Sequence, residues 1–169
     1  MKSLMIALAL FTLVKGPEYY QNYIDIKHKK VKSAIETYYG TDPLVKLGIK
    51  FPDVVRAQIA LETCWLTSDI YKDNGNMFGM KASSRNWDCG NQHGHANYNC
   101  TDSKIPAQIR SLCDYRDWQA MRFEQASNKG IKIPKTNKEY IYFLQHLPGG
   151  GAYAEDPAYP NKLRYIMSL

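Results

Sequence analysis

Residues 51–68 constrain the fold of this 169-residue chain most, because they form an apolar stretch with a single late carboxylate, Glu62. Pro52 suits the first turn of a helix, where its missing N–H breaks no hydrogen bond, and Asp53 suits the positive end of the helix dipole. At about 100° per residue, several apolar positions share one helix face with Glu62. These positions are Val55, Ile59, Trp65 and Leu66. We therefore predict a helix over residues 52–66 with Glu62 on its apolar face.

Glu62 is a candidate catalytic acid, because a carboxylate that faces apolar neighbours is costly to ionise. Its pKa is then expected to rise, which is the condition that a general acid needs near neutral pH. The alternative is a carboxylate at a helix end that reaches solvent and has no catalytic role. The helical stretch by itself leaves both interpretations open.

The rest of the chain predicts one mostly helical domain with a polar, loop-rich insertion near its middle. Composition and the turn signals at residues 73–76 and 148–151 predict further helices. These helices cover residues 19–39, 118–126, 137–147 and 160–167. Residues 105–115 fit either a strand or the lead into a helix. Residues 87–103 are rich in Asn, Gly and His, so we predict an irregular loop or a short hairpin there.

The charge and aromatic content favour an anionic, sugar-containing partner. The formal net charge of +6 suits nucleic acid, an anionic membrane or an acidic cell-wall polymer. The dense basic run at residues 27–32 comes with no nucleic-acid recognition motif, so we predict a solvated helix face there and no nucleic-acid partner. The 13 Tyr and 3 Trp suit sugar rings, whose C–H faces pack on aromatic side chains.

An apolar run at residues 4–13 marks the N-terminus. It is too short to span a bilayer but suits the core of a signal peptide, although no small-residue cleavage site follows it. Export and a buried N-terminal helix both stay open. We therefore divide the chain into an apolar segment, 1–16, and a main domain, 17–169, and predict no stable membrane span.

Four cysteines are too few for a disulfide scaffold in a chain of this length. Cys89 and Cys100 flank a polar loop that could bring them together. Reduced cysteines that pack as small apolar groups are the preferred interpretation, and a disulfide is expected if the protein is exported. A zinc site with His93 and His95 is a third alternative, but its spacing matches no usual zinc pattern. We predict no metal and no cofactor.

Three segments, in this order along the chain, resemble bacterial glucosaminidases of glycoside hydrolase family 73, a group of autolysins and flagellar peptidoglycan hydrolases. They are residues 57–65 (Ala-Gln-Ile-Ala-Leu-Glu-Thr-Cys-Trp), residues 74–81 (Asn-Gly-Asn-Met-Phe-Gly-Met-Lys) and residues 153–159 (Tyr-Ala-Glu-Asp-Pro-Ala-Tyr). The resemblance extends over about residues 43–169. It implies an α+β fold: a predominantly helical, lysozyme-like domain with a small loop or β-hairpin lobe beside the cleft.

The same resemblance implies hydrolysis of the β-1,4 bond after N-acetylglucosamine in peptidoglycan, with Glu62 as general acid. Tyr153 would lie near the reacting sugar, where its hydroxyl would position an N-acetyl group or a water. Four residues are expected in the substrate site, of which the first two would shape the cleft floor. They are Asn76, Phe78, Trp65 and Tyr159.

A second catalytic carboxylate is harder to assign. Inverting glycosidases hold a base roughly 6.5–9.5 Å from the acid, and retaining enzymes hold a nucleophile at about 5–5.5 Å. In the family this residue tends to come from the hairpin lobe, where the candidates are Asp88, Asp102, Asp114 and Asp117. We favour Asp102, which follows the cysteine-bounded loop. The alternative is that the substrate's own N-acetyl group acts as nucleophile.

The chain departs from the family pattern where Cys64 and Leu66 stand at usual glycine positions, which adds bulk beside the proposed acid. The leading hypothesis is a peptidoglycan glucosaminidase, either exported to the cell envelope as an autolysin or phage-encoded as an endolysin or virion enzyme. The alternative from another class is a non-catalytic cell-wall-binding or virion structural module that kept the cleft.

Overall fold

The computed structural model describes residues 42–168. The N-terminal segment, the basic run and the helix predicted over residues 19–39 lie outside the described residues. The elements, in chain order, are α3 (Pro43–Lys46), α4 (Pro52–Glu62), α5 (Asp69–Asn74), β1 (Asn91–Gln92), β2 (His95–Ala96), α6 (Ala107–Asn128), α7 (Asn137–Gln145) and α8 (Tyr159–Met167).

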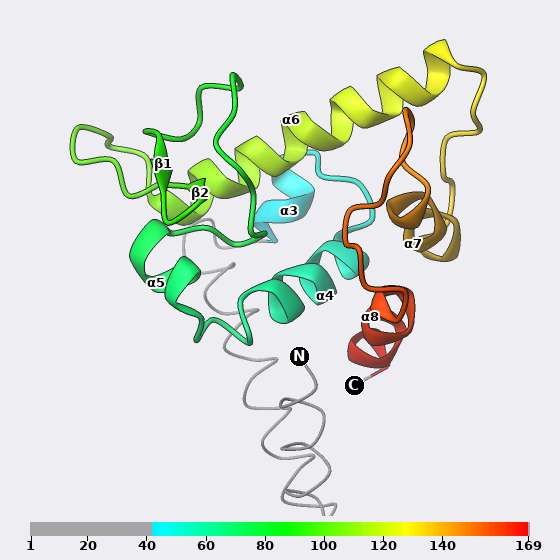
Figure 1. Ribbon diagram of the computed structural model, residues 1–169, viewed down its shortest axis with the longest axis horizontal. Helices are drawn as coiled ribbons and strands as arrows, with labels where there is room; N and C mark the ends of the chain where they lie inside the picture. Colours follow the sequence, from blue (N-terminus) through cyan, green and yellow to red (C-terminus); the bar gives the residue numbers. More distant parts are fainter. Residues whose placement is uncertain (1–41, 169) are drawn as a thin grey trace, which may run out of the picture.

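Helix α4 lies at the centre of this arrangement. The long helix α6 crosses above it, α7 and α8 lie toward one end, and α5 with the β1–β2 hairpin lies toward the other (Figure 1). Helices α7 and α8 pack on α4 and on each other, and α5 packs on β2. The predicted fold class is therefore confirmed: α+β, mainly helical, with a small hairpin lobe.

The core forms around α4. Its side chains Val54, Val55 and Ile59 are fully buried, as are Leu144 of α7 and Leu163 of α8. Burying one such side chain contributes about 1.5–3 kcal/mol relative to leaving it exposed. This apolar packing fixes the direction in which the C-terminal end of α4 points.

Helix α4 ends at Glu62, four residues earlier than predicted. The Thr63 hydroxyl donates to the Ile59 carbonyl at 2.6 Å and accepts from the Leu66 amide at 2.9 Å, which turns the chain back on itself. Cys64, Trp65 and Leu66 follow with φ of 48°, 59° and 63°. The last two residues therefore do not continue the helix face of Glu62.

Helix α6 is continuous over residues that were predicted as two separate pieces. The ambiguous segment 105–115 mostly belongs to it, since neither Gly nor Pro interrupts Ala107–Asn128. Helices α7 and α8 begin and end within two residues of their predicted bounds. The Thr136 hydroxyl caps α7 by accepting from the Glu139 amide at 3.2 Å.

An irregular loop or a short hairpin was predicted for the loop-rich insertion, and the structure has a short hairpin, with Asn91 opposite Ala96 in antiparallel register. Cys89 and Cys100 form a disulfide at its base, so the preference for reduced cysteines is wrong at this pair. The zinc alternative is wrong too, because neither sulfur is left as a thiolate ligand. Within residues 42–168, no helix has the length and apolar character that a membrane span requires.

Candidate active site

Glu62 is the last residue of α4 and is half-buried. Burial raises the pKa of its carboxyl above the ordinary value, and a hydrogen bond from Tyr159 opposes that rise. The C-terminal end of a helix carries partial negative charge, which also disfavours a carboxylate. The side chain is therefore held as a carboxylic acid to higher pH than usual, as a general acid requires.

The three sequence motifs converge on this carboxyl group. The Tyr159 hydroxyl donates to Glu62 Oε1 at 3.0 Å. The Tyr153 hydroxyl donates to the Phe78 carbonyl at 2.9 Å, which ties the C-terminal motif to the middle one. Gly79 of the middle motif lies over the other carboxyl oxygen, since a Cβ there would be 3.8 Å from Glu62 Oε2. Residues far apart in sequence thus surround one acidic group.

Asn76 builds the loop that carries Gly79. Its Oδ1 accepts from the amides of Phe78 and Met80 at 3.2 and 3.1 Å, and its Nδ2 donates to the carbonyls of Met80 and Ala96 at 2.9 and 3.0 Å. Phe78 is buried and stacks on a core tyrosine. Burial places both side chains beneath the site, as supports of its floor, and leaves them little surface for direct contact with a substrate.

The family described as mannosyl-glycoprotein endo-beta-N-acetylglucosaminidase matches residues 44–169. The chain belongs to the glucosaminidase family. The chain is similar to the catalytic domain of the autolysin Auto from Listeria monocytogenes, which is known from a crystal structure. The sequence identity is 25% and the TM-score is 0.48, and the match covers 95% of this chain and 89% of that chain. No curated protein matches the chain significantly.

This glucosaminidase is therefore a glycoside hydrolase. Glu62 lies where the three sequence segments singled out above meet. Tyr153 is half-buried, and its ring lies edge-on to Trp118 at 5.4 Å. Its proton is directed to the Phe78 carbonyl, so its hydroxyl oxygen stays available only as an acceptor. Trp65 is half-buried in the left-handed turn after Glu62. Roles in substrate binding for Tyr153 and Trp65 stay predictions.

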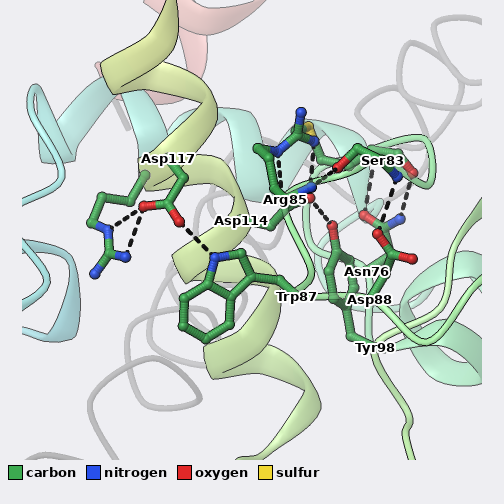
Figure 2. Close-up of polar contacts among 10 residues, drawn as sticks. Asn76, Ser83, Arg85, Trp87, Asp88, Tyr98, Asp114 and Asp117 are labelled. Carbon is green, nitrogen blue, oxygen red and sulfur yellow. Dashed lines mark hydrogen bonds and ion pairs between the residues drawn. The ribbon is translucent and has the colours of Figure 1, made fainter.

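Two carboxylates considered as the second catalytic group fasten the hairpin lobe of the glucosaminidase to α6 (Figure 2). Asp114 is fully buried, forms an ion pair with Arg85 and accepts a hydrogen bond from the Tyr98 hydroxyl. Asp117 accepts from the Trp87 indole N–H at 2.6 Å. Because both carboxylates already stabilise the fold in this way, neither is suited to activate a water.

The other two candidates lie within the lobe or beside it. Asp88 accepts from the backbone amide of Ser83 at 3.1 Å (Figure 2). It also accepts from the backbone amide of Gly90 at 3.0 Å, and the two contacts shape a tight turn. Asp102 is exposed in the turn between Cys100 and α6, and its carboxylate has no hydrogen-bond partner among residues 42–168. No described contact joins Asp102 to Glu62, and its catalytic role stays a prediction.

Sequence reasoning missed Gln58, which is fully buried next to the acid. Its Nε2 donates to the Tyr159 hydroxyl at 3.2 Å, and its Oε1 accepts from the Tyr115 hydroxyl at 2.5 Å. The position was detectable in principle, because a polar residue four places before Glu62 lies on the same face of a helix. Its partners Tyr115 and Tyr159 were not detectable in this way, because they lie 57 and 101 residues further along the sequence.

Proposed function

We propose that this glucosaminidase hydrolyses peptidoglycan at the β-1,4 bond that follows N-acetylglucosamine, with Glu62 as general acid. The observation that carries the proposal is the half-buried carboxyl group at the end of α4, surrounded by the three family motifs and with a raised pKa. The net charge of +6 supports an anionic polymer as substrate.

In the proposed reaction, Glu62 transfers its proton to the glycosidic oxygen as the C–O bond breaks. General-acid help of this kind contributes typically about 10²–10⁴-fold in rate. Hydrolysis is complete when the oxygen of a water bonds to the anomeric carbon. A second group assists this step, either as a base that takes a proton from the water or as a nucleophile that the water then displaces. We propose Asp102 for this step, because the other acidic residues of the lobe already hold the fold together. The alternative is the N-acetyl group of the substrate.

The Cys89–Cys100 disulfide supports action outside the cytosol, because such bonds persist in oxidising compartments. We therefore place the proposed reaction at the cell envelope. The phage origin considered above stays a prediction.

The test is digestion of purified peptidoglycan by the full chain, followed by borohydride reduction and mass spectrometry of the products. Reduced N-acetylglucosamine at the new chain ends is the expected result. Reduced N-acetylmuramic acid instead would contradict the proposed bond. Co-sedimentation with peptidoglycan and no new reducing ends would favour the non-catalytic binding module.

A further inference from the structure

A continuous row of buried hydrogen bonds leads from Glu62 into the core. Its members are Gln119, Tyr140, Tyr115, Gln58 and Tyr159, in that order toward Glu62, and we name this set the donor chain. Successive polar atoms are 2.8, 2.7, 2.5, 3.2 and 3.0 Å apart. All five residues are at most 3% exposed, so water does not compete for the four hydrogen bonds between them, and the fifth, to the half-buried Glu62, lies at the edge of the core.

The far end of the donor chain has a fixed orientation. Gln119 Oε1 accepts from the Lys50 amide at 2.8 Å, and Gln119 Nε2 donates to the Lys50 carbonyl at 3.1 Å. Backbone groups therefore determine which atom of this amide is oxygen and which is nitrogen. The second hydrogen of Nε2 must point to the Tyr140 hydroxyl, which can only accept it.

The fixed orientation of the Gln119 amide determines which group donates in each later hydrogen bond of the donor chain. Tyr140 accepts from Gln119, so its own proton goes to Tyr115, and the Tyr115 proton goes to Gln58 Oε1. Gln58 Nε2 then donates to Tyr159, whose single proton goes to Glu62. A reversed chain would bring the Tyr140 proton against the Gln119 N–H, which cannot accept it.

The three phenols retain their protons at physiological pH. Burial raises the pKa of Tyr140 to about 12. Burial also raises the pKa values of Tyr115 and Tyr159 well above their ordinary value. Each hydroxyl therefore always has one proton to donate, and the direction of the chain does not change between neutral and moderately alkaline pH.

We propose that the donor chain positions Glu62 so that Oε1 is a permanent hydrogen-bond acceptor and Oε2 is the oxygen that carries the acidic proton. If Oε1 carried it, two protons would lie between Glu62 and Tyr159, and the Tyr159 hydroxyl would have no other acceptor in the described contacts. Oε2 is the oxygen that faces Gly79, where the missing side chain leaves room. The glycosidic oxygen would therefore approach beside Gly79.

Few other titratable groups surround Glu62. Tyr159 of α8 donates a hydrogen bond to Glu62, and Tyr140 of α7 is linked to Glu62 through the other members of the donor chain. Tyr153 interacts with the charge of Glu62. His95 also contacts Gly79, with its Nδ1 3.0 Å from the Gly79 carbonyl oxygen. Among the described residues, no Lys, Arg or Asp contributes to the pKa shift of Glu62.

The inference rests on the proposed function, but its test does not need activity. The full chain, labelled with ¹³C at the glutamate carboxyls, is titrated by NMR, and Glu62→Gln identifies the Glu62 signal. We expect Tyr159→Phe to raise the pKa of Glu62, since among the described residues the Tyr159 hydroxyl is the side chain that donates a hydrogen bond to the ionised form. Tyr115→Phe should raise it by a smaller amount, because Gln58 loses the donor that holds its amide in place.

Tyr98→Phe is the matched control, because it removes a buried tyrosine hydroxyl that donates to Asp114 and does not belong to the donor chain. It should leave the Glu62 titration unchanged. Tyr140→Phe serves as a second chain variant if Tyr115→Phe does not fold. A Glu62 titration that is unchanged in these chain variants would overturn the inference. A wild-type enzyme that leaves peptidoglycan intact while the shifts occur would count against the proposed function alone.

Where the enzyme is active, the alkaline limb of its pH–rate profile should move to higher pH in Tyr115→Phe and stay in place in Tyr98→Phe. A purely structural role for Tyr115 would lower the amount of folded enzyme without moving that limb. An unmoved limb would therefore overturn the positioning role.

Discussion

The Tyr159 hydroxyl donates a hydrogen bond to Glu62 Oε1 at 3.0 Å and so joins α8 to the last residue of α4, 97 positions earlier in the chain. This contact opposes the rise in pKa that burial imposes on the carboxyl group. Two opposite effects therefore act on the pKa of Glu62. Burial raises the pKa and keeps the carboxyl group protonated, and the hydrogen bond from Tyr159 lowers the pKa and fixes the orientation of the group.

The free energy of unfolding of Glu62→Gln, relative to that of wild type, should increase as pH rises. The folded-state pKa of Glu62 lies above the ordinary value of 4.5, so the folded protein binds more protons than the unfolded chain in the range just above it. Wild-type stability then falls with pH relative to the neutral variant. Urea unfolding from pH 4 to pH 8 measures the difference. Glu139→Gln is the control with the opposite sign, because hydrogen bonding to Lys132 lowers the pKa of Glu139.

Cys64→Gly should increase stability. Cys64 has φ of 48°, a left-handed conformation that costs a non-glycine residue about 1–2 kcal/mol. Part of this gain is offset by the greater freedom of glycine in the unfolded chain. Lys72→Gly, within α5, is the control and should destabilise. Equal losses of stability in both variants would show that the turn after Glu62 is not strained.

Gly79→Ala should reduce activity by more than its effect on stability explains. A Cβ at this position would lie 3.8 Å from Glu62 Oε2, on the side where we place the glycosidic oxygen. Gly48→Ala is the matched control, since Gly48 also has positive φ, of 75°, but open space around it. Both variants should lose roughly 1–2 kcal/mol of stability. Peptidoglycan clearing by folded protein at a permissive temperature should fall only in Gly79→Ala.

Arg85→Ala should destabilise the protein by about 3–5 kcal/mol, because it leaves the fully buried Asp114 carboxylate without its ion-pair partner. Lys132→Ala is the matched control: its ion pair with Glu139 is exposed, so its loss should have little effect. Thermal unfolding compares the two. Similar, small losses would show that Asp114 does not depend on Arg85.

Local signals predicted much of the fold. The apolar periodicity before Glu62, together with Pro52, predicted the start of α4, and the Pro-Gly segment at residues 148–151 marked the end of α7. The end of α4 was missed because the Thr63 hydroxyl, and not a glycine or proline, turns the chain.

The site was predicted only in part, for a related reason. The motifs made Glu62 and Tyr159 candidate site residues, and the structure shows that the two are in contact. The hydrogen bonds that lead to Glu62 join residues from α4, α6, α7 and α8. The fold brings these residues together, and no local pattern in the sequence signals such long-range pairs. Asp114 illustrates the same limit: as a sequence position it was a candidate base, and in the fold it is a buried anchor of the hairpin lobe.

The most direct test of Glu62 as general acid is the rate of dye release from labelled peptidoglycan by wild type and Glu62→Gln at neutral pH. Glu124→Gln, an exposed change on α6, serves as control. Loss of the acid should lower the rate roughly 10²–10⁴-fold in Glu62→Gln and leave the control unchanged. Equal rates for wild type and Glu62→Gln, with both proteins folded, would contradict the assignment.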